Sequence, residues 1–146
     1  MPTMELTGAP SRLENLDWNE CLRLVAEEEV GRLGVVDGYH PMIFPVNYVL
    51  DGERVVFRTD PGSKLRSFGQ DVCFEVDSFD RETRTGWSVV IKGQLDEAME
   101  FDRPELVDRI RSLPVEPWAG GEKAHWMFIR PVSITGRRIV RRPPAT

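Results

Sequence analysis

The chain of 146 residues contains two cysteines and two histidines, too few for most sites that depend on these side chains. Cys21 and Cys73 do not form a Cys-x-x-Cys motif, and His40 and His125 lie far apart in the chain. No serine lies in a nucleophile-elbow motif, and neither a P-loop nor a G-x-G-x-x-G motif is present. The sequence therefore predicts no metal site, and an enzyme built from these residues would depend on an organic cofactor.

The sequence also lacks a long hydrophobic run, a signal peptide and a lipidation motif, so we expect a cytoplasmic protein without a membrane partner. The net charge of −5 at pH 7 disfavours general binding to nucleic acid, and we expect no such partner. With 40% apolar and 29% charged residues, the composition is that of an ordinary globular protein. The length fits a single domain over residues 1–146, with a loose N-terminal arm at residues 1–13 and a tail at residues 142–146.

Hydrophobic periodicity predicts more strands than helices. Helices are expected to begin after Asp17, after Ser63 and at Pro104. Gly31 is expected to end the first helix, and the polar residues 77–86 are expected to form a long surface connection. Short strands are expected at residues 32–36, 42–50, 55–59, 71–76, 87–95, 126–129 and 132–140.

The order of these elements decides between fold classes. Helical connections between successive strands are too few for a parallel sheet. The pattern favours a mainly β (α+β) fold, in which an antiparallel, Greek-key barrel carries two or three short helices and hides its strand edges by closing. A flat two-layer α+β sheet is the alternative. Gly93 is expected to mark a bulge, and Pro131 to separate the last two strands.

The segment from Pro45 to Phe68, PVNYVLDGERVVFRTDPGSKLRSF, predicts a hairpin followed by a loop and a short helix. Asp51 and Gly52 lie between two runs of alternating apolar residues, and an Asp-Gly pair readily takes the positive φ angles of a type I′ turn. Ser63 is suited to cap the short helix that follows.

The end of this hairpin is suited to binding a phosphate. A helix start leaves backbone N–H groups unpaired and carries partial positive charge. Thr59 and Ser63 add hydroxyl donors, Lys64 a compact cation and Arg58 a planar pair of donors. The alternative interpretation is a solvent-exposed turn with ordinary surface charges. His40 is expected in another turn, as a solvent-facing residue or as a titrating group at the mouth of the site.

Four segments, GRLGVV, PVNYVLDGERVVFRT, GSK and RTGWSVVIKG, occur in an order and spacing that resemble the pyridoxamine 5′-phosphate oxidase-like family. Members of that family have the FMN-binding split-barrel fold. The resemblance extends from about Val30 to Ile139 and is strongest to the small actinobacterial-type and nitroimidazole-resistance-like branch.

The resemblance implies three groups of cofactor-binding residues and a homodimer with two cofactor sites at the subunit interface. The phosphate group would be held by Arg58, Thr59, Ser63 and Lys64. The isoalloxazine ring would lie, largely through backbone contacts, along Pro45, Val46, Asn47 and Tyr48. A strand start that often approaches the flavin corresponds to Trp87 and Ser88.

The function implied by the resemblance is a flavin-dependent oxidoreductase that binds FMN, or the deazaflavin F420, and acts on a small organic substrate. The chain departs from the true pyridoxamine phosphate oxidases in lacking their full C-terminal substrate-binding signature. It also has one cation, Lys64, where those oxidases have two. The alternative is a non-catalytic module that stores or senses a flavin or haem. The sequence assigns no catalytic residue.

Overall fold

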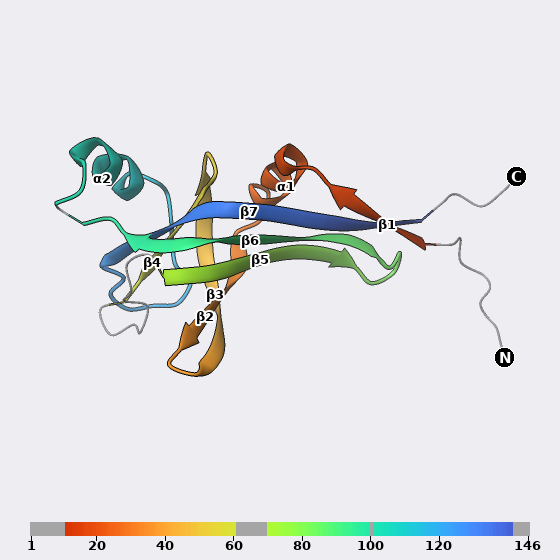
Figure 1. The fold of residues 1–146 in the computed structure, drawn as a ribbon, viewed down its shortest axis with the longest axis horizontal. Helices are drawn as coiled ribbons and strands as arrows, with labels where there is room; N and C mark the ends of the chain where they lie inside the picture. Colours follow the sequence, from red (N-terminus) through yellow and green to blue (C-terminus); the bar gives the residue numbers. More distant parts are fainter. Residues whose placement is uncertain (1–10, 61–69, 100, 142–146) are drawn as a thin grey trace, which may run out of the picture.

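The computed structural model describes residues 11–60, 70–99 and 101–141, which form seven strands and two helices (Figure 1). Residues 1–10, the predicted tail and the predicted helix after Ser63 lie outside the described residues. In chain order the elements are β1 (Ser11–Leu16), α1 (Trp18–Val25), β2 (Val30–Asp37), β3 (His40–Asp51), β4 (Arg54–Thr59), β5 (Gln70–Asp80), β6 (Thr85–Glu97), α2 (Pro104–Arg111) and β7 (His125–Arg141).

Six of the strands close into an antiparallel barrel. Their order is β7-β4-β3-β2-β5-β6, and a further pairing of β6 with β7 completes the ring. β1 pairs with the C-terminal half of β7, outside this ring. The structure thus confirms the predicted mainly β split barrel, and the alternative of a flat two-layer sheet is wrong.

The main hydrophobic core fills the inside of the ring. Val55 and Phe57 on β4 and Phe74 and Val76 on β5 are completely buried, which matches the alternation in their sequences. A second apolar cluster lies outside the ring, where α2 packs against the barrel. Its buried members are Val56, Ala98, Ile110, Val115 and Phe128. No helix among the described residues is long and apolar enough to cross a membrane.

The last two predicted strands are one continuous strand, so the prediction that Pro131 separates them is wrong. β7 pairs with β6 along its length, and the register shifts between Lys92 and Gly93, where a bulge was predicted. Lys92 lies opposite Ser133 and Gly93 opposite Pro131, so Val132 is the additional residue. The bulge allows both halves of β7 to direct apolar side chains into the barrel.

The two-residue loops of the β2–β3 and β3–β4 hairpins each begin with a glycine at positive φ. Asp51 pairs with Arg54, so the loop between β3 and β4 consists of Gly52 and Glu53, with Gly52 at φ 62°. Glu53 has no positive φ, which excludes the predicted type I′ turn and fits a type II′ turn. Asp51 lies in the strand because its buried carboxylate pairs with two arginines from different elements. Those arginines are Arg54 and Arg109.

Three predicted boundaries are wrong. β1 begins at Ser11, so the last three residues of the predicted loose arm are paired with β7. α1 ends at Val25, and Gly31 lies within β2 instead of ending the helix. A Cβ at Gly31 would lie 2.2 Å from Cζ of Phe74, so close packing in the barrel explains this glycine. β5 and β6 continue through most of the predicted surface connection, which leaves only residues 81–84 between them.

The starts of the two helices differ in their capping. Asp17 caps α1 as predicted, because its carboxylate accepts a hydrogen bond from the N–H of Glu20 at 2.8 Å. α2 begins at Pro104, also as predicted, but it has no side-chain cap. Asp102 instead accepts a hydrogen bond from the N–H of Met99 at 2.9 Å, which fixes the turn before the helix.

Candidate functional site

The predicted ring strand lies where the barrel opens. Residues 40–47 of β3 pair with β2, whereas pairing with β4 begins only at Tyr48. Figure 1 shows the β2–β3 hairpin projecting away from the long β5–β6–β7 ribbon. Among the described residues, no strand pairs with the other edge of β3 before Tyr48. One edge of β3 is therefore open along residues 40–47, which include all of the predicted ring-binding segment except Tyr48.

The open edge of β3 is richer in acceptors than in donors. The N–H of Tyr48 donates to the carbonyl of Glu29 at 3.1 Å. In an antiparallel pair, the backbone N–H and C=O groups of every second residue counted back from Tyr48 therefore point to β2. The residues between them direct their backbone groups to the open edge, and these are Pro41, Ile43, Pro45 and Asn47. Prolines have no N–H, so they hinder the addition of another strand but leave carbonyls for a ligand.

The side chains of the predicted ring residues point to both faces of β3. Val46 packs against the barrel core and Tyr48 is buried within it, whereas Pro45 and Asn47 point outward. The hydroxyl of Tyr48 donates to the carbonyl of Val25, and burial raises the pKa of this phenol above its ordinary value. The side chain and the N–H of Tyr48 are therefore both engaged in hydrogen bonds within the chain.

Replacing Tyr48 by phenylalanine is expected to lower the free energy of unfolding by about 1–3 kcal/mol, because the buried carbonyl of Val25 loses its hydrogen bond. Thermal unfolding would measure this loss. The matched control is Tyr39→Phe, since Tyr39 is 97% exposed and should tolerate the change. A Tyr48→Phe variant as stable as the control would contradict the structural role of this hydroxyl.

Arg58 and Thr59, predicted to bind phosphate, lie side by side at the end of β4 but on opposite faces. Nε of Arg58 donates to the carbonyl of Lys123 at 3.0 Å, and its guanidinium lies 4.7 Å from the ring centroid of Trp126. Its Nη1 also donates to the carbonyl of Val115 at 3.4 Å. Thr59 lies on the inner face and is 8% exposed. Two other predicted phosphate-binding residues, Ser63 and Lys64, lie outside the described residues.

Sequence reasoning missed three residues that the fold brings to the end of β4. Lys123 pairs with Asp60, with 3.4 Å between Nζ and Oδ2. His125 is the direct cross-strand neighbour of Thr59, and its Nδ1 lies 2.8 Å from Oε2 of Glu97. No local motif connects these positions to the hairpin. Only the pairings of β7 with β4 and with β6, across the intervening chain, could have revealed them.

Trp87 and Ser88 lie on β6, three strands from β3 in either direction around the ring. Trp87 packs against the barrel core, and Ser88 is the cross-strand neighbour of Asp77 and Arg137. β3 and β6 therefore lie on opposite sides of the barrel. A single chain does not bring Ser88 to the predicted ring strand.

Two cavities lie beside the predicted ring strand. A cavity of about 450 Å³ borders Asn47 and Tyr48, and the N–H of Trp118 donates to Oδ1 of Asn47 at 2.8 Å at its wall. A groove of about 560 Å³ lies where the β2–β3 hairpin separates from β5 and β6. Exposed apolar side chains in this groove include Val36, Ile43 and Val132. The groove is mainly apolar, whereas the cavity carries the acidic side chains of Glu28, Glu29 and Glu116 on its wall.

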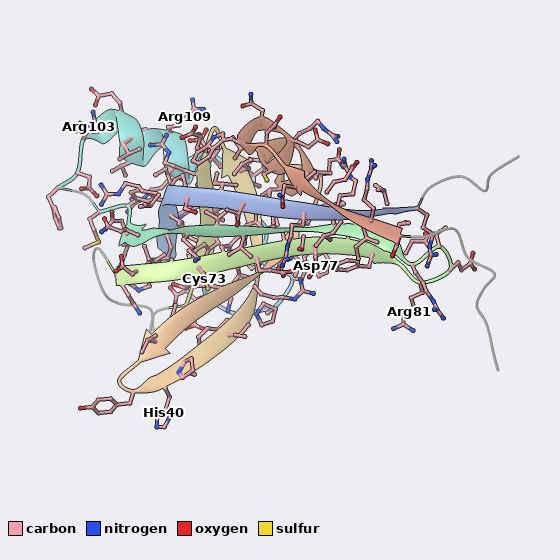
Figure 2. The ribbon with its side chains drawn as sticks, turned by 45° about the vertical axis from the view of Figure 1, so that its right-hand side comes forward. His40, Cys73, Asp77, Arg81, Arg103 and Arg109 are labelled. Carbon is pink, nitrogen blue, oxygen red and sulfur yellow. The ribbon has the colours of Figure 1, made fainter. Side chains whose placement is uncertain are left out.

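Figure 2 shows that the labelled side chain of His40, at the tip of the β2–β3 hairpin, lies apart from the labelled charged side chains on the rest of the molecule. His40 is the first residue of β3 and lies exposed at the tip of the projecting hairpin, away from the end of β4. Asp77 lies along β5, where it and Glu75 share Arg32, whose Nη1 is 3.6 Å and 3.3 Å from their carboxylates. Burial and the neighbouring Asp77 raise the pKa of Glu75 from 4.5 to about 7.

This raised pKa predicts a dependence of stability on pH. Between pH 4.5 and about 7 the folded chain retains the proton of Glu75 that the unfolded chain loses, so stability falls as the pH rises through this range. Glu75→Gln should remove the fall and stabilise the protein at pH 8 but not at pH 4. Because the side chain is 30% exposed, solvent screening should limit the gain to about 1 kcal/mol.

Melting temperatures at pH 4 and pH 8 would test the expected effect of Glu75→Gln. The exposed Glu122 provides the control variant, Glu122→Gln, which should follow the wild type at both pH values. An equal stabilisation of Glu75→Gln at both pH values would show that proton uptake by Glu75 is not the cause.

Comparison with known proteins shows similarity over most of the chain. A family model described as pyridoxamine 5′-phosphate oxidase matches residues 17–138. An uncharacterized protein of Mycobacterium tuberculosis is 36% identical over 132 residues, which cover 86% of this chain and 84% of that protein. A solved structure of a conserved protein of unknown function from Corynebacterium diphtheriae is 36% identical with a TM-score of 0.69, covering 88% of this chain and 98% of that chain. The FAD binding protein from Mycobacterium smegmatis is 29% identical with a TM-score of 0.64, covering 87% of this chain and 98% of that chain.

Proposed function

Because this chain belongs to the pyridoxamine 5′-phosphate oxidase family, we propose that it is a flavin-binding oxidoreductase that acts on a small organic substrate. FMN is the proposed cofactor and F420 the alternative. The bound flavin would supply the hydride or electron transfer, and the protein would bind and orient it and exclude water.

The observation that carries this proposal is the open edge of β3 next to the end of β4. The pyrimidine part of a flavin ring presents an N–H donor between two carbonyl acceptors, so it can hydrogen-bond to an unpaired strand edge. Pro45 leaves a carbonyl on that edge, and Asn47 lies where pairing with β4 is about to begin. The phosphate would then lie at the loop that follows Thr59. This geometry supports both FMN and F420, which share the same pyrimidine edge.

The similarity to the FAD binding protein from Mycobacterium smegmatis also supports a flavin. FAD has the same ring and the same first phosphate as FMN, so the same parts of the chain would contact both. FAD differs by an adenylate group that must lie beyond the first phosphate. FAD is therefore included in the binding test.

We also propose that the protein acts as a homodimer with a cofactor at each end of the interface. Trp87 and Ser88 lie on the opposite side of the barrel from β3, so they can approach a flavin on β3 only from a second copy. Exposed apolar residues in the groove beside β3, including Ile43 and Val132, supply a surface that a second copy would cover. Light scattering should give twice the mass of one chain. A monomer that binds flavin would contradict the proposed dimer but not the proposed flavin binding.

The experiment is a titration of the purified protein with FMN, F420, FAD and riboflavin, in which flavin fluorescence or absorbance measures binding. The proposal predicts saturable binding of at least one phosphorylated flavin and weaker binding of riboflavin. Absence of saturable binding for all four would contradict the proposed function. Haem serves as a further probe, because the alternative function is a module that stores or senses flavin or haem without catalysis.

Turnover distinguishes the oxidoreductase from this alternative. The bound flavin should be reduced by NAD(P)H or a reduced partner and reoxidised by an acceptor over several cycles. Tight flavin binding without any such cycle would favour the storage or sensor module, which the missing C-terminal substrate signature also suggests.

A further inference from the structure

Three polar side chains lie in a row across neighbouring strands at one end of the barrel. Thr59 on β4 is the direct cross-strand neighbour of His125 on β7. His125 in turn contacts Glu97 on β6. Thr59 is one of the residues that the sequence predicts to bind phosphate. The row therefore continues the predicted anion site onto two further strands.

Glu97 fixes the orientation of the imidazole. Nδ1 of His125 lies 2.8 Å from Oε2 of Glu97, and a carboxylate can only accept a hydrogen bond, so Nδ1 carries the proton. The Nε2 atom then points away from Glu97. The side chains of His125 and Glu97 are 38% and 24% exposed, so the pair is not sealed within the barrel core.

The strand that carries His125 is held firmly against the end of β4. Arg58 donates to the carbonyl of Lys123 at 3.0 Å and packs over Trp126. Lys123 also pairs with Asp60, which is the first residue after β4. These contacts on both sides of His125 hold its backbone in place beside Thr59.

We propose that His125 is a further anion-binding residue, which contacts the phosphate of the flavin at the end of β4. Nδ1 donates to Glu97 while Nε2 makes a hydrogen bond with the phosphate group. Glu97 is then the positioning residue. This inference rests on the proposed flavin-binding function and deepens it.

The test compares FMN, which carries the phosphate, with riboflavin, which lacks it. His125→Asn places its amide near the position of Nδ1 and leaves nothing at Nε2, so it should weaken FMN binding by about tenfold or more. Riboflavin binding should not change. His125→Gln places an amide N–H near the position of Nε2 and should retain more of the FMN affinity. The control is His40→Asn, at the hairpin tip, which should bind both flavins like the wild type.

A second measurement does not depend on flavin binding. The chain has two histidines, so ¹⁵N-histidine labelling gives two imidazole spin systems, which the His40→Asn variant assigns. Titration with inorganic phosphate should shift the Nε2 resonance of His125 and leave that of His40 in place. Glu97→Gln should reduce the shift, because an amide in place of the carboxylate no longer requires Nδ1 to be the donor and so no longer fixes the ring.

The outcomes separate the two proposals. A shift of His125 by phosphate in a protein that binds no flavin would support the anion site and contradict the flavin function. Flavin binding with an unchanged ratio of FMN to riboflavin affinity in His125→Asn, together with no phosphate shift, would overturn the role of His125 alone.

Discussion

Replacing Phe74 by alanine is expected to lower the free energy of unfolding by about 3–5 kcal/mol. Phe74 is completely buried, and its ring meets that of Tyr48 edge-to-face with 5.1 Å between centroids. The ring also lies against the backbone of Gly31, where no side chain is available to fill a vacated space. Because β2 is held by strands on both sides, the resulting cavity cannot collapse easily.

Urea denaturation would measure the effect of Phe74→Ala, and the melting temperature should fall by about 10 °C. Phe79→Ala is the matched control on the same strand, since Phe79 is 55% exposed near the tip of the β5–β6 hairpin. The control should change stability by less than about 1 kcal/mol. Equal losses in the two variants would contradict the placement of the barrel core.

Replacing Lys64 by alanine is expected to weaken FMN binding by about 10–100-fold, because a charged hydrogen bond to the phosphate is lost. Binding of riboflavin should remain unchanged, since it has no phosphate. The expectation rests on the sequence, in which Lys64 follows Ser63 at the predicted helix start beyond β4.

The control for Lys64→Ala is Arg81→Ala, which removes an equal charge from the exposed turn between β5 and β6. The two variants have the same net charge, so a general electrostatic effect on an anionic ligand would appear in both. A loss of FMN affinity that is equal in both variants, or a parallel loss of riboflavin affinity, would contradict a direct contact between Lys64 and the phosphate.

The fold was predictable where a local rule determined the structure. Alternation of apolar residues around Phe74 located β5, and the glycine of the β3–β4 loop located a hairpin. The errors arose where contacts between residues distant in sequence determine the local structure. Gly31 has the appearance of a helix stop, but the neighbouring Phe74 ring requires it. β7 continues past Pro131 because a bulge accommodates it opposite β6.

The candidate site was predictable only along a continuous stretch of chain. The sequence identified the hairpin strand that carries Pro45 and the strand end at Thr59, and the structure shows that β3 has an open edge there. The sequence did not identify His125 or Glu97, because neither lies in a motif and the β4–β7 and β6–β7 pairings bring them to the end of β4. The sequence also could not show that Ser88 lies across the barrel from β3.

A crystal structure of the protein with FMN tests the central claim most directly. We expect the pyrimidine edge of the ring to hydrogen-bond to the β3 backbone near Pro45, and the phosphate to lie at the end of β4 beside Thr59. Trp87 and Ser88 of a second copy should approach the same flavin. An FMN molecule bound elsewhere, with the open edge of β3 untouched, would contradict the account.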